Sequence, residues 1–199
     1  MLNLPNILTL SRIAIIPLMV ITFFFDSSAM RWGACLLYTA ACITDFFDGY
    51  LARRSNQISR FGRFLDPIAD KLLVAAVLLM LVGFGRLTLW AYLPALIILL
   101  REIMVSGLRE FLAELRIGLP VTRLAKFKTT AQMIALGFLI VGSAAPWWIP
   151  ARVIGEASLW IAAGLTLITG YDYLRAGLRY MDEGVPLPES TRDSQPSQS

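Results

Sequence analysis

The 199-residue sequence contains no histidine and only two cysteines. The lack of histidine excludes the commonest acid–base side chain and the commonest ligand of transition metals, so any proton transfer would fall to Asp or Glu. Cys35 and Cys42 are seven residues apart within one predicted helix, which is too far for a disulfide in that conformation. We therefore expect both cysteines to be ordinary apolar side chains.

Charge is also scarce, because 16% of the residues are charged and 57% are hydrophobic, with a mean hydropathy of +0.65. This apolar share exceeds that of an average soluble domain and predicts an all-α polytopic membrane protein. We expect one domain over residues 1–181 and a disordered polar tail over 182–199. A signal peptide over residues 1–25 is disfavoured, since it would need a basic first region and a small-residue cleavage site.

Apolar runs predict a bundle of six transmembrane helices. The first run, residues 3–25, begins with polar residues, so we expect an N-terminal interfacial helical segment that then enters the bilayer. The other runs cover about 31–53, 62–82, 90–115, 123–141 and 152–174. Trp147 and Trp148 fall between the last two runs, at the depth expected of an aromatic belt.

The basic residues predict the orientation of this bundle. With six spans, fifteen of the 18 Lys and Arg residues fall on the side of the N-terminus, and only Arg31, Arg86 and Arg152 fall on the other. Cytoplasmic loops carry the excess of such residues, so both termini should face the cytoplasm. The net charge of +4 then reflects topology, and we expect no nucleic-acid partner.

Four carboxylates interrupt the apolar chain between residues 45 and 70. Asp45 and Asp48 are three residues apart, and Asp66 and Asp70 are four apart, so each pair lies on one face of a helix. Two paired helices would direct all four carboxylates at one point. Because clustered negative charges near hydrocarbon stay ionised only when cations hold them, the pattern predicts a site for a hard divalent metal.

Small residues accompany these carboxylates. Gly49 and Ala52 share the helical face of Asp45 and Asp48. A glycine inside a helix lowers stability by about 1 kcal/mol relative to alanine. We interpret Gly49 as a residue that makes room for a bulky ligand in return for this loss. Arg53 follows at the predicted membrane boundary, where a guanidinium suits a phosphate. The pattern thus favours a divalent metal and a phosphate-bearing ligand in a tight pocket.

The complete spacing resembles, without departure, the signature of the CDP-alcohol phosphotransferase family: Asp45-x2-Asp48-Gly49-x2-Ala52-Arg53-x8-Gly62-x3-Asp66-x3-Asp70. The resemblance implies a six-helix membrane enzyme, usually a homodimer, in which an alcohol displaces CMP from a CDP-linked donor with Mg²⁺ or Mn²⁺. The segments LPNILTLSR, REIMVSGLREFLAE and KFKTTAQM resemble the family members that join CDP-diacylglycerol to glycerol 3-phosphate. For this chain the likeness implies phosphatidylglycerol phosphate and CMP as products.

The resemblance also implies roles for individual residues. Asp45, Asp48 and Asp66 would be the principal ligands of two metal ions, and Asp70 would lie beside the metals as the base that deprotonates the acceptor hydroxyl. The residues implied at the CDP-diacylglycerol site are Gly49, Ala52, Arg53, Ser59 and Gly62, together with Asn6, Thr9 and Arg12 of the first segment.

The acceptor is inferred from basic residues outside the motif. Arg101, Arg109, Lys126 and Lys128 would converge on an anion beside the metals, as a phosphate group requires. A neutral or cationic acceptor such as choline would gain nothing from four cations. The charges therefore favour a phosphorylated acceptor, but they do not separate glycerol phosphate from inositol phosphate.

Simpler interpretations stay open for several residues. Asp66 before Pro67 is also typical of a helix N-cap with proline at the first helical position. The cations of the fourth and fifth helices would equally suit lipid headgroups or acidic partners, namely Glu102, Glu110 and Glu114. Positive-inside anchoring alone explains Arg54 and Arg60, and a plain interfacial stripe explains Asn6, Thr9 and Arg12.

Two alternative functions also stay open. One is a sister transferase whose acceptor is inositol phosphate, phosphatidylglycerol or serine. The other belongs to a different class, a cation or proton transporter whose acidic residues line the ion path. A transporter has no need of Gly49, Ala52 and Gly62 at fixed spacing from the carboxylates.

Overall fold

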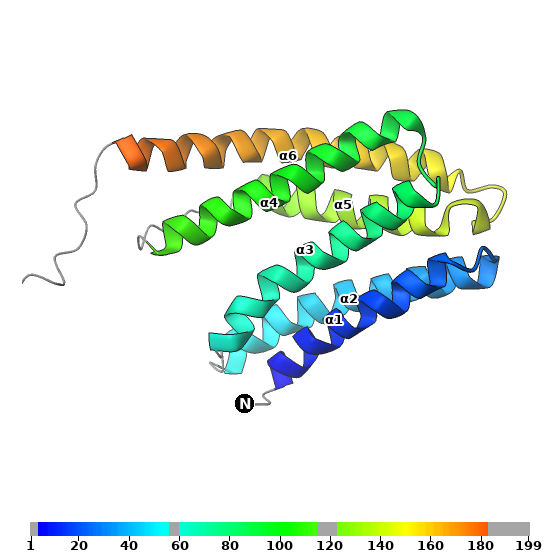
Figure 1. Ribbon diagram of the computed structural model, residues 1–199, viewed down its shortest axis with the longest axis horizontal. Coiled ribbons are helices and arrows are strands. Elements are labelled where there is room, and N and C mark those ends of the chain that lie inside the picture. The colour runs from blue at the N-terminus through cyan, green and yellow to red at the C-terminus, as the bar shows by residue number, and fades with distance from the viewer. Residues whose placement is uncertain (1–3, 56–59, 115–122, 183–199) are drawn as a thin grey trace, which may run out of the picture.

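The computed structural model describes residues 4–55, 60–114 and 123–182, which form α-helices joined by short loops (Figure 1). The helices are α1 (Leu4–Phe23), α2 (Ser28–Ser55), α3 (Arg60–Gly83), α4 (Tyr92–Glu114), α5 (Arg123–Val141) and α6 (Ala151–Asp182), with two short 3-10 turns, η1 (Leu89–Ala91) and η2 (Gly142–Ala144). The predicted all-α class is confirmed. Residues 183–199 of the predicted tail lie outside the described part of the chain.

Three stretches of the described chain are long and apolar enough to cross a membrane, judged by length and composition. They are Leu89–Leu112, Phe127–Ala144 and Ala151–Arg175, and Ile7–Phe23 is a shorter apolar helix. The predicted membrane character is therefore supported, and the count of six spans stays a prediction. Cys35 and Cys42 are both free, as expected.

Consecutive helices are antiparallel and form two groups (Figure 1). α1 packs against α2 and α3, and α6 packs against α4 and α5. Contacts of α2 with α5, and of α3 with α4 and α5, join the two groups. The loops α1–α2, α3–α4 and α5–α6 lie at one end of the bundle, and the beginning of α1 and the end of α6 lie at the other.

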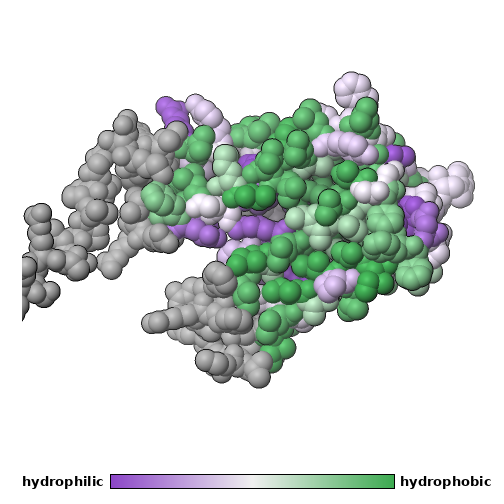
Figure 2. Space-filling view, in the orientation of Figure 1, coloured by the Kyte–Doolittle hydropathy of each residue, from purple (hydrophilic) through white to green (hydrophobic). Residues whose placement is uncertain are grey.

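The core is built from apolar side chains of all six helices. Met19 and Phe23 of α1, Leu81 of α3 and Leu159 of α6 are among its fully buried members. Large apolar side chains also cover the outside, and most of the face in Figure 2 is hydrophobic. An apolar exterior of this extent suits a lipid environment.

α5 and α6 approach each other closely at Gly155. A Cβ placed on Gly155 would lie 2.6 Å from Cγ of Leu139 and 3.2 Å from the backbone oxygen of Ala135. Small residues at helix contacts allow such approach in membrane bundles. Gly155 therefore sets the distance between these two helices.

The N-cap interpretation of Asp66 is wrong. α3 begins at Arg60, and Pro67 lies inside the helix. The Asp66 side chain instead accepts a hydrogen bond from Thr9 of α1. An internal proline is tolerated in membrane helices because neighbouring groups satisfy the freed backbone carbonyls.

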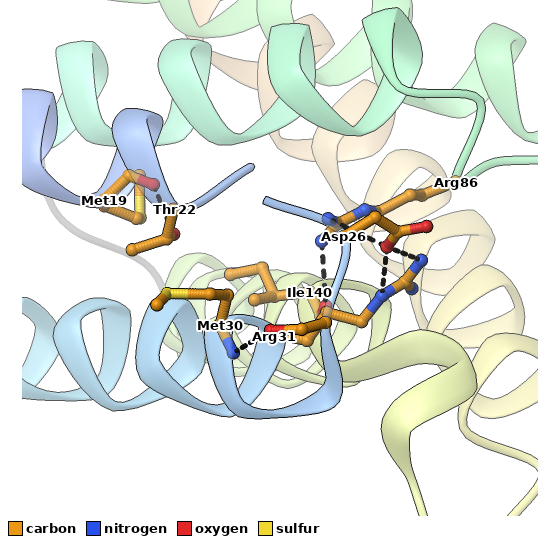
Figure 3. A network of polar contacts seen from close by, with 8 residues as sticks. Met19, Thr22, Asp26, Met30, Arg31, Arg86 and Ile140 are labelled. Atoms are coloured by element: carbon orange, nitrogen blue, oxygen red, sulfur yellow. Dashed lines mark hydrogen bonds and ion pairs between the residues drawn. The ribbon is translucent and has the colours of Figure 1, made fainter. Parts of the chain in front are cut away.

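Polar contacts tie together the loops at one end of the bundle (Figure 3). Arg31 donates from Nε and Nη2 to Oδ1 of Asp26, at 3.0 and 2.7 Å, and these contacts hold the pKa of Asp26 below its ordinary value. Arg86 lies 3.9 Å from the same carboxylate, stacks over Phe23 and donates to the carbonyl of Ile140. We call Asp26, Arg31 and Arg86 the loop clamp.

A second contact at this end joins α6 to the α3–α4 loop. The backbone N–H and hydroxyl of Thr88 donate to the two carboxylate oxygens of Glu156, each at 2.8 Å. Arg152 also contacts Glu156, at 3.3 Å. Each of the three cations that the sequence assigned to this side of the membrane therefore has an acidic partner.

Candidate active site

The acidic residues of α2 and α3 meet around α1. Nη1 of Arg12 lies 2.6 Å from Oδ1 of Asp70 and 3.0 Å from Oδ1 of Asp45. The Arg12 side chain is fully buried, whereas the side chains of Asp45 and Asp70 are 36% and 48% exposed. One guanidinium therefore connects three helices and leaves both carboxylates accessible to a ligand.

Thr9 extends the same contact surface by one turn. Its hydroxyl is buried and donates to Oδ1 of Asp66 at 2.5 Å. Thr9 and Arg12 are three residues apart on α1, and their partners Asp66 and Asp70 are four apart on α3, so each pair lies on one helical face. The two contacts fix the register of α1 against α3. We call Thr9, Arg12, Asp45, Asp66 and Asp70 the acidic site.

The donor set of this site fits a hard divalent cation. Carboxylate oxygens are the ligands that Mg²⁺ and Mn²⁺ prefer, and Arg12 offsets only one of the three negative charges that the ionised carboxylates carry. The described side chains by themselves form no group of three metal ligands. The side chain of Asp48, the fourth predicted ligand, lies outside the described part of the structure.

The structure describes only some of the other residues that were predicted for the CDP-diacylglycerol site. Gly62 is buried on α3, one turn before Asp66. Asn6 falls within α1, and Gly49, Ala52 and Arg53 fall within α2, but their side chains lie outside the described residues, as does Ser59 altogether. Thr9 and Arg12 contact the carboxylates, which a plain interfacial stripe does not explain.

A second polar group lies between α4, α5 and α6. Arg101 and Lys128 are both buried, and Lys128 forms an ion pair with Glu102. Arg101 donates to the hydroxyl of Thr169 at 2.9 Å and lies 3.9 Å from Glu102. We call Arg101, Glu102, Lys128 and Thr169 the basic site.

The remaining predicted acceptor residues are less tightly placed. Arg109 is exposed on α4, and the side chain of Lys126 lies outside the described residues. Lys71 of α3 is 3.8 Å from Glu110 of α4. The structure thus gives Lys128 the acidic partner that the sequence left as an alternative, and it also pairs Lys71, for which the sequence predicted no partner. Hydropathy and charge offered no signal for Thr169, because it is a neutral residue inside an apolar run.

Two cavities border these sites. One, of about 220 Å³ between α3 and α4, is lined by Lys71 and Glu102 and otherwise by apolar side chains. The other, of about 400 Å³ between α2 and α5, has an almost wholly apolar lining that ends at Cys42, one turn from Asp45. Figure 2 shows hydrophilic residues gathered between the two groups of helices.

Comparison with known proteins gives one consistent answer. Residues 2–168 match the family model described as CDP-alcohol phosphatidyltransferase. A protein from Rickettsia bellii is 51% identical over 178 residues, which cover 89% of this chain and 97% of the relative. A Cereibacter sphaeroides protein is 40% identical, with 91% and 98% covered, and a Shigella flexneri serotype 5b protein is 43% identical, with 87% and 94% covered. All three are named CDP-diacylglycerol–glycerol-3-phosphate 3-phosphatidyltransferase.

Proposed function

This chain belongs to the CDP-alcohol phosphatidyltransferase family, and we propose that it transfers a phosphatidyl group from CDP-diacylglycerol to glycerol 3-phosphate. The products are phosphatidylglycerol phosphate and CMP, so the protein is a transferase of phospholipid biosynthesis. The observation that carries the proposal is the match over nearly the full length of relatives that bear this name. The acidic and basic sites supply the chemistry that such a transfer needs.

The acidic site takes the donor and activates the acceptor. Asp45, Asp48 and Asp66 are the proposed ligands of two Mg²⁺ or Mn²⁺ ions, which when bound supply charge neutralisation at the donor's pyrophosphate. Asp70 accepts the proton of the acceptor hydroxyl, since its carboxylate is partly exposed and held by Arg12. The acceptor oxygen then forms a bond to the donor's phosphorus, and the bond to the CMP oxygen breaks.

The nucleotide half of the donor lies beside the small residues of the motif. Gly49, Ala52 and Gly62 are the small residues proposed to make room for it, and Arg53 and Ser59 are the proposed polar contacts. Asn6 is the proposed donor contact at the start of α1, and Thr9 and Arg12 orient the acidic residues. Substitution of Gly62 by Leu should raise the KM for CDP-diacylglycerol, and an unchanged KM would remove Gly62 from the donor pocket.

The basic site binds the phosphate of glycerol 3-phosphate. Arg101 and Lys128 are buried cations of the kind that a phosphate requires, and Arg109 and Lys126 are the proposed outer contacts. The cavity between α3 and α4 is lined by Glu102 of this site and by Lys71, which follows Asp70 in the sequence, and otherwise by apolar side chains.

The protein is proposed to be a multi-pass protein of the cytoplasmic membrane with six spans. Both termini and the active site face the cytoplasm, since the opposite end holds only three of the 18 basic residues. In a cysteine-free background, Trp147→Cys should react with an impermeant maleimide in intact cells, and its protection would reverse the orientation.

A homodimer is the proposed assembly. The family resemblance and the large apolar surface support it, since lipid-facing helices also provide surfaces for self-association. Native mass spectrometry in mild detergent should give the mass of two chains, and a strictly monomeric active protein would contradict the proposal.

An acceptor panel tests the proposed function. Purified protein with Mg²⁺ and CDP-diacylglycerol should release CMP only when glycerol 3-phosphate is added. Inositol phosphate, phosphatidylglycerol and serine serve as matched alternatives, and equal or faster turnover with any of them would assign a sister activity. Cation flux in proteoliposomes without CMP release would instead support the transporter alternative.

A further inference from the structure

Arg101 is a buried cation whose closest described contacts come from a neighbouring helix, while its own helix supplies the ion pair with Glu102 at 3.9 Å. Arg101 is 8% exposed and lies on α4, within a stretch that is apolar enough to cross a membrane. A guanidinium carries five N–H donors in a fixed plane, and burying it is costly unless these donors find partners. The direction of the Arg101 side chain therefore depends on what the neighbouring helices offer.

α6 offers a hydroxyl whose orientation is fixed. Oγ1 of Thr169 donates to the carbonyl of Leu165 at 2.8 Å and accepts from Nη2 of Arg101 at 2.9 Å. Because a hydroxyl has one hydrogen, its use toward Leu165 turns a lone pair toward the guanidinium. Thr169 thus acts as an acceptor aimed at Arg101.

The next residues of α6 complete the contact. A Cβ on Gly170 would lie 3.1 Å from Cγ and 3.2 Å from Nε of Arg101, so the arginine stem runs directly over this glycine. The ring of Tyr173 lies 5.7 Å from Cζ of Arg101, within the range of a cation–π contact. Thr169, Gly170 and Tyr173 lie on one helical face, and we call them the arginine seat.

The Nε donor of Arg101 has no described partner. Nε is buried and has no hydrogen-bond partner among the residues that the structure describes. Nη2 is used by Thr169, and Nη1 is 3.9 Å from Glu102. An unused donor on a buried, oriented guanidinium is suited to an anionic ligand.

We propose that the arginine seat of α6 positions Arg101 for the phosphate of the acceptor, and that Thr169 is a positioning residue for acceptor binding. The inference rests on the proposed function, because it assumes glycerol 3-phosphate as the acceptor. It adds α6 to a site whose other members come from α4 and α5. The donor site is not involved, since the arginine seat makes its contacts with Arg101.

Thr169→Val tests the seat, because valine keeps the shape and removes the hydroxyl. Loss of a hydrogen bond to a charged group should raise the KM for glycerol 3-phosphate about tenfold. The KM for CDP-diacylglycerol and the kcat should change little, as expected when only binding of one substrate is weakened. Thr169→Ser retains the hydroxyl and should restore the acceptor KM.

Thr166→Val is the matched control on the same helix. Thr166 is also fully buried, and its Oγ1 has no hydrogen-bond partner among the described residues. This variant should keep the acceptor KM of the wild type. If Thr169→Val and Thr166→Val have the same acceptor KM, or if Thr169→Ser does not restore it, the positioning role is overturned.

A second pair of variants tests steric contact with Arg101 instead of hydrogen bonding. Gly170→Ala presses on the stem of Arg101 and should raise the acceptor KM, whereas a Cβ on Gly164 of the same helix meets no atom within 4 Å. Gly164→Ala should therefore behave as the wild type, and equal acceptor KM values in the two variants would contradict the proposal.

Wild-type protein in the same CMP-release assay distinguishes a failure of the proposed function from a failure of the arginine seat. If the wild type does not use glycerol 3-phosphate, the proposed function fails. If the wild type uses it but Thr169→Val binds it normally, the proposed function stands and the arginine seat is overturned.

Discussion

Arg12 is the residue that holds the acidic site together, because its buried guanidinium contacts carboxylates from two other helices. Removing one partner of a buried ion pair typically costs about 3–5 kcal/mol, since the other charge is left without compensation. Asp45 and Asp70 are half-exposed, so water softens that cost on their side. The contact therefore orients Asp70 and leaves its carboxylate partly exposed.

Asp70→Asn should separate chemistry from donor binding. Asparagine keeps the size of the side chain and an oxygen that can accept from Arg12, but it cannot accept the acceptor's proton. Loss of a general base should lower the rate of CMP release by about 10²–10⁴-fold. Metal-dependent binding of CDP-diacylglycerol, measured by calorimetry in detergent, should largely persist.

Asp26→Asn is the matched control for this substitution. Asp26 is exposed and lies in the α1–α2 loop, at the opposite end of the bundle. It should leave turnover near that of the wild type. Near-normal turnover in Asp70→Asn would remove Asp70 from the role of base.

Sequence spacing predicted the carboxylates of the acidic site but not their shared partner. The motif shows which residues share a face of one helix, yet Arg12 and Asp70 are 58 positions apart. A contact at that separation depends on how helices pack, which spacing within a helix does not determine. For the same reason Lys128 was recognisable as a cation, whereas its pairing with Glu102 was only one alternative.

At the scale of the elements, the helices were predictable because an apolar environment forces backbone groups to pair within a helix. The expected run over 123–141 coincides with α5. The arrangement of the helices was less predictable. The sequence suggested that two paired helices bring the carboxylates together. In the structure, α1 packs against both α2 and α3 and contacts the carboxylates of each. Composition alone gives no signal for such an arrangement.

Gly155→Ala should weaken the contact between α5 and α6. The added methyl would overlap Leu139, and the backbone of Ala135 limits how far α6 can move away. Overpacking of this kind costs about 1–3 kcal/mol, and thermal unfolding in detergent should show a lower Tm.

Gly164→Ala on the same helix is the control for that measurement. The space around Gly164 is open, and alanine is favoured over glycine in a helix by about 1 kcal/mol. Its Tm should be equal to or higher than that of the wild type. Equal Tm values for the Gly155 and Gly164 variants would show that α5 and α6 tolerate a larger separation.

At the scale of the whole molecule, the described residues place different groups of charged side chains toward the two ends of the bundle. One end is tied by the loop clamp and by the contact of Thr88 with Glu156. The other end carries the acidic and basic sites, with charged groups that the substrates would contact.

The loop clamp should make stability depend on pH in the acid range. Hydrogen bonds from Arg31 lower the pKa of Asp26 from its ordinary value of 3.8. A carboxylate with a lowered folded pKa contributes stability above its unfolded pKa and loses it as pH falls through the folded pKa. Asp26→Asn should thus lower the Tm at neutral pH, and the difference should vanish at a pH below the folded pKa.

Arg31→Gln removes the same pair from its other side and should show the same pH dependence. Both effects should be small, since the Asp26 side chain is 74% exposed and water screens the pair. A difference in Tm that persists unchanged at the lowest pH would mean that the charge of Asp26 does not contribute to the clamp.

The order of the helices along the chain gives Arg12 a further consequence, for biosynthesis. α1 precedes α2 and α3, so Arg12 is synthesised before Asp45 and Asp70, the two residues whose carboxylates it contacts. Charged groups are costly to place in a bilayer without partners. In the proposed six-span arrangement, each acidic helix would enter a membrane in which its counter-cation is already present, whereas Arg12 would enter before its partners.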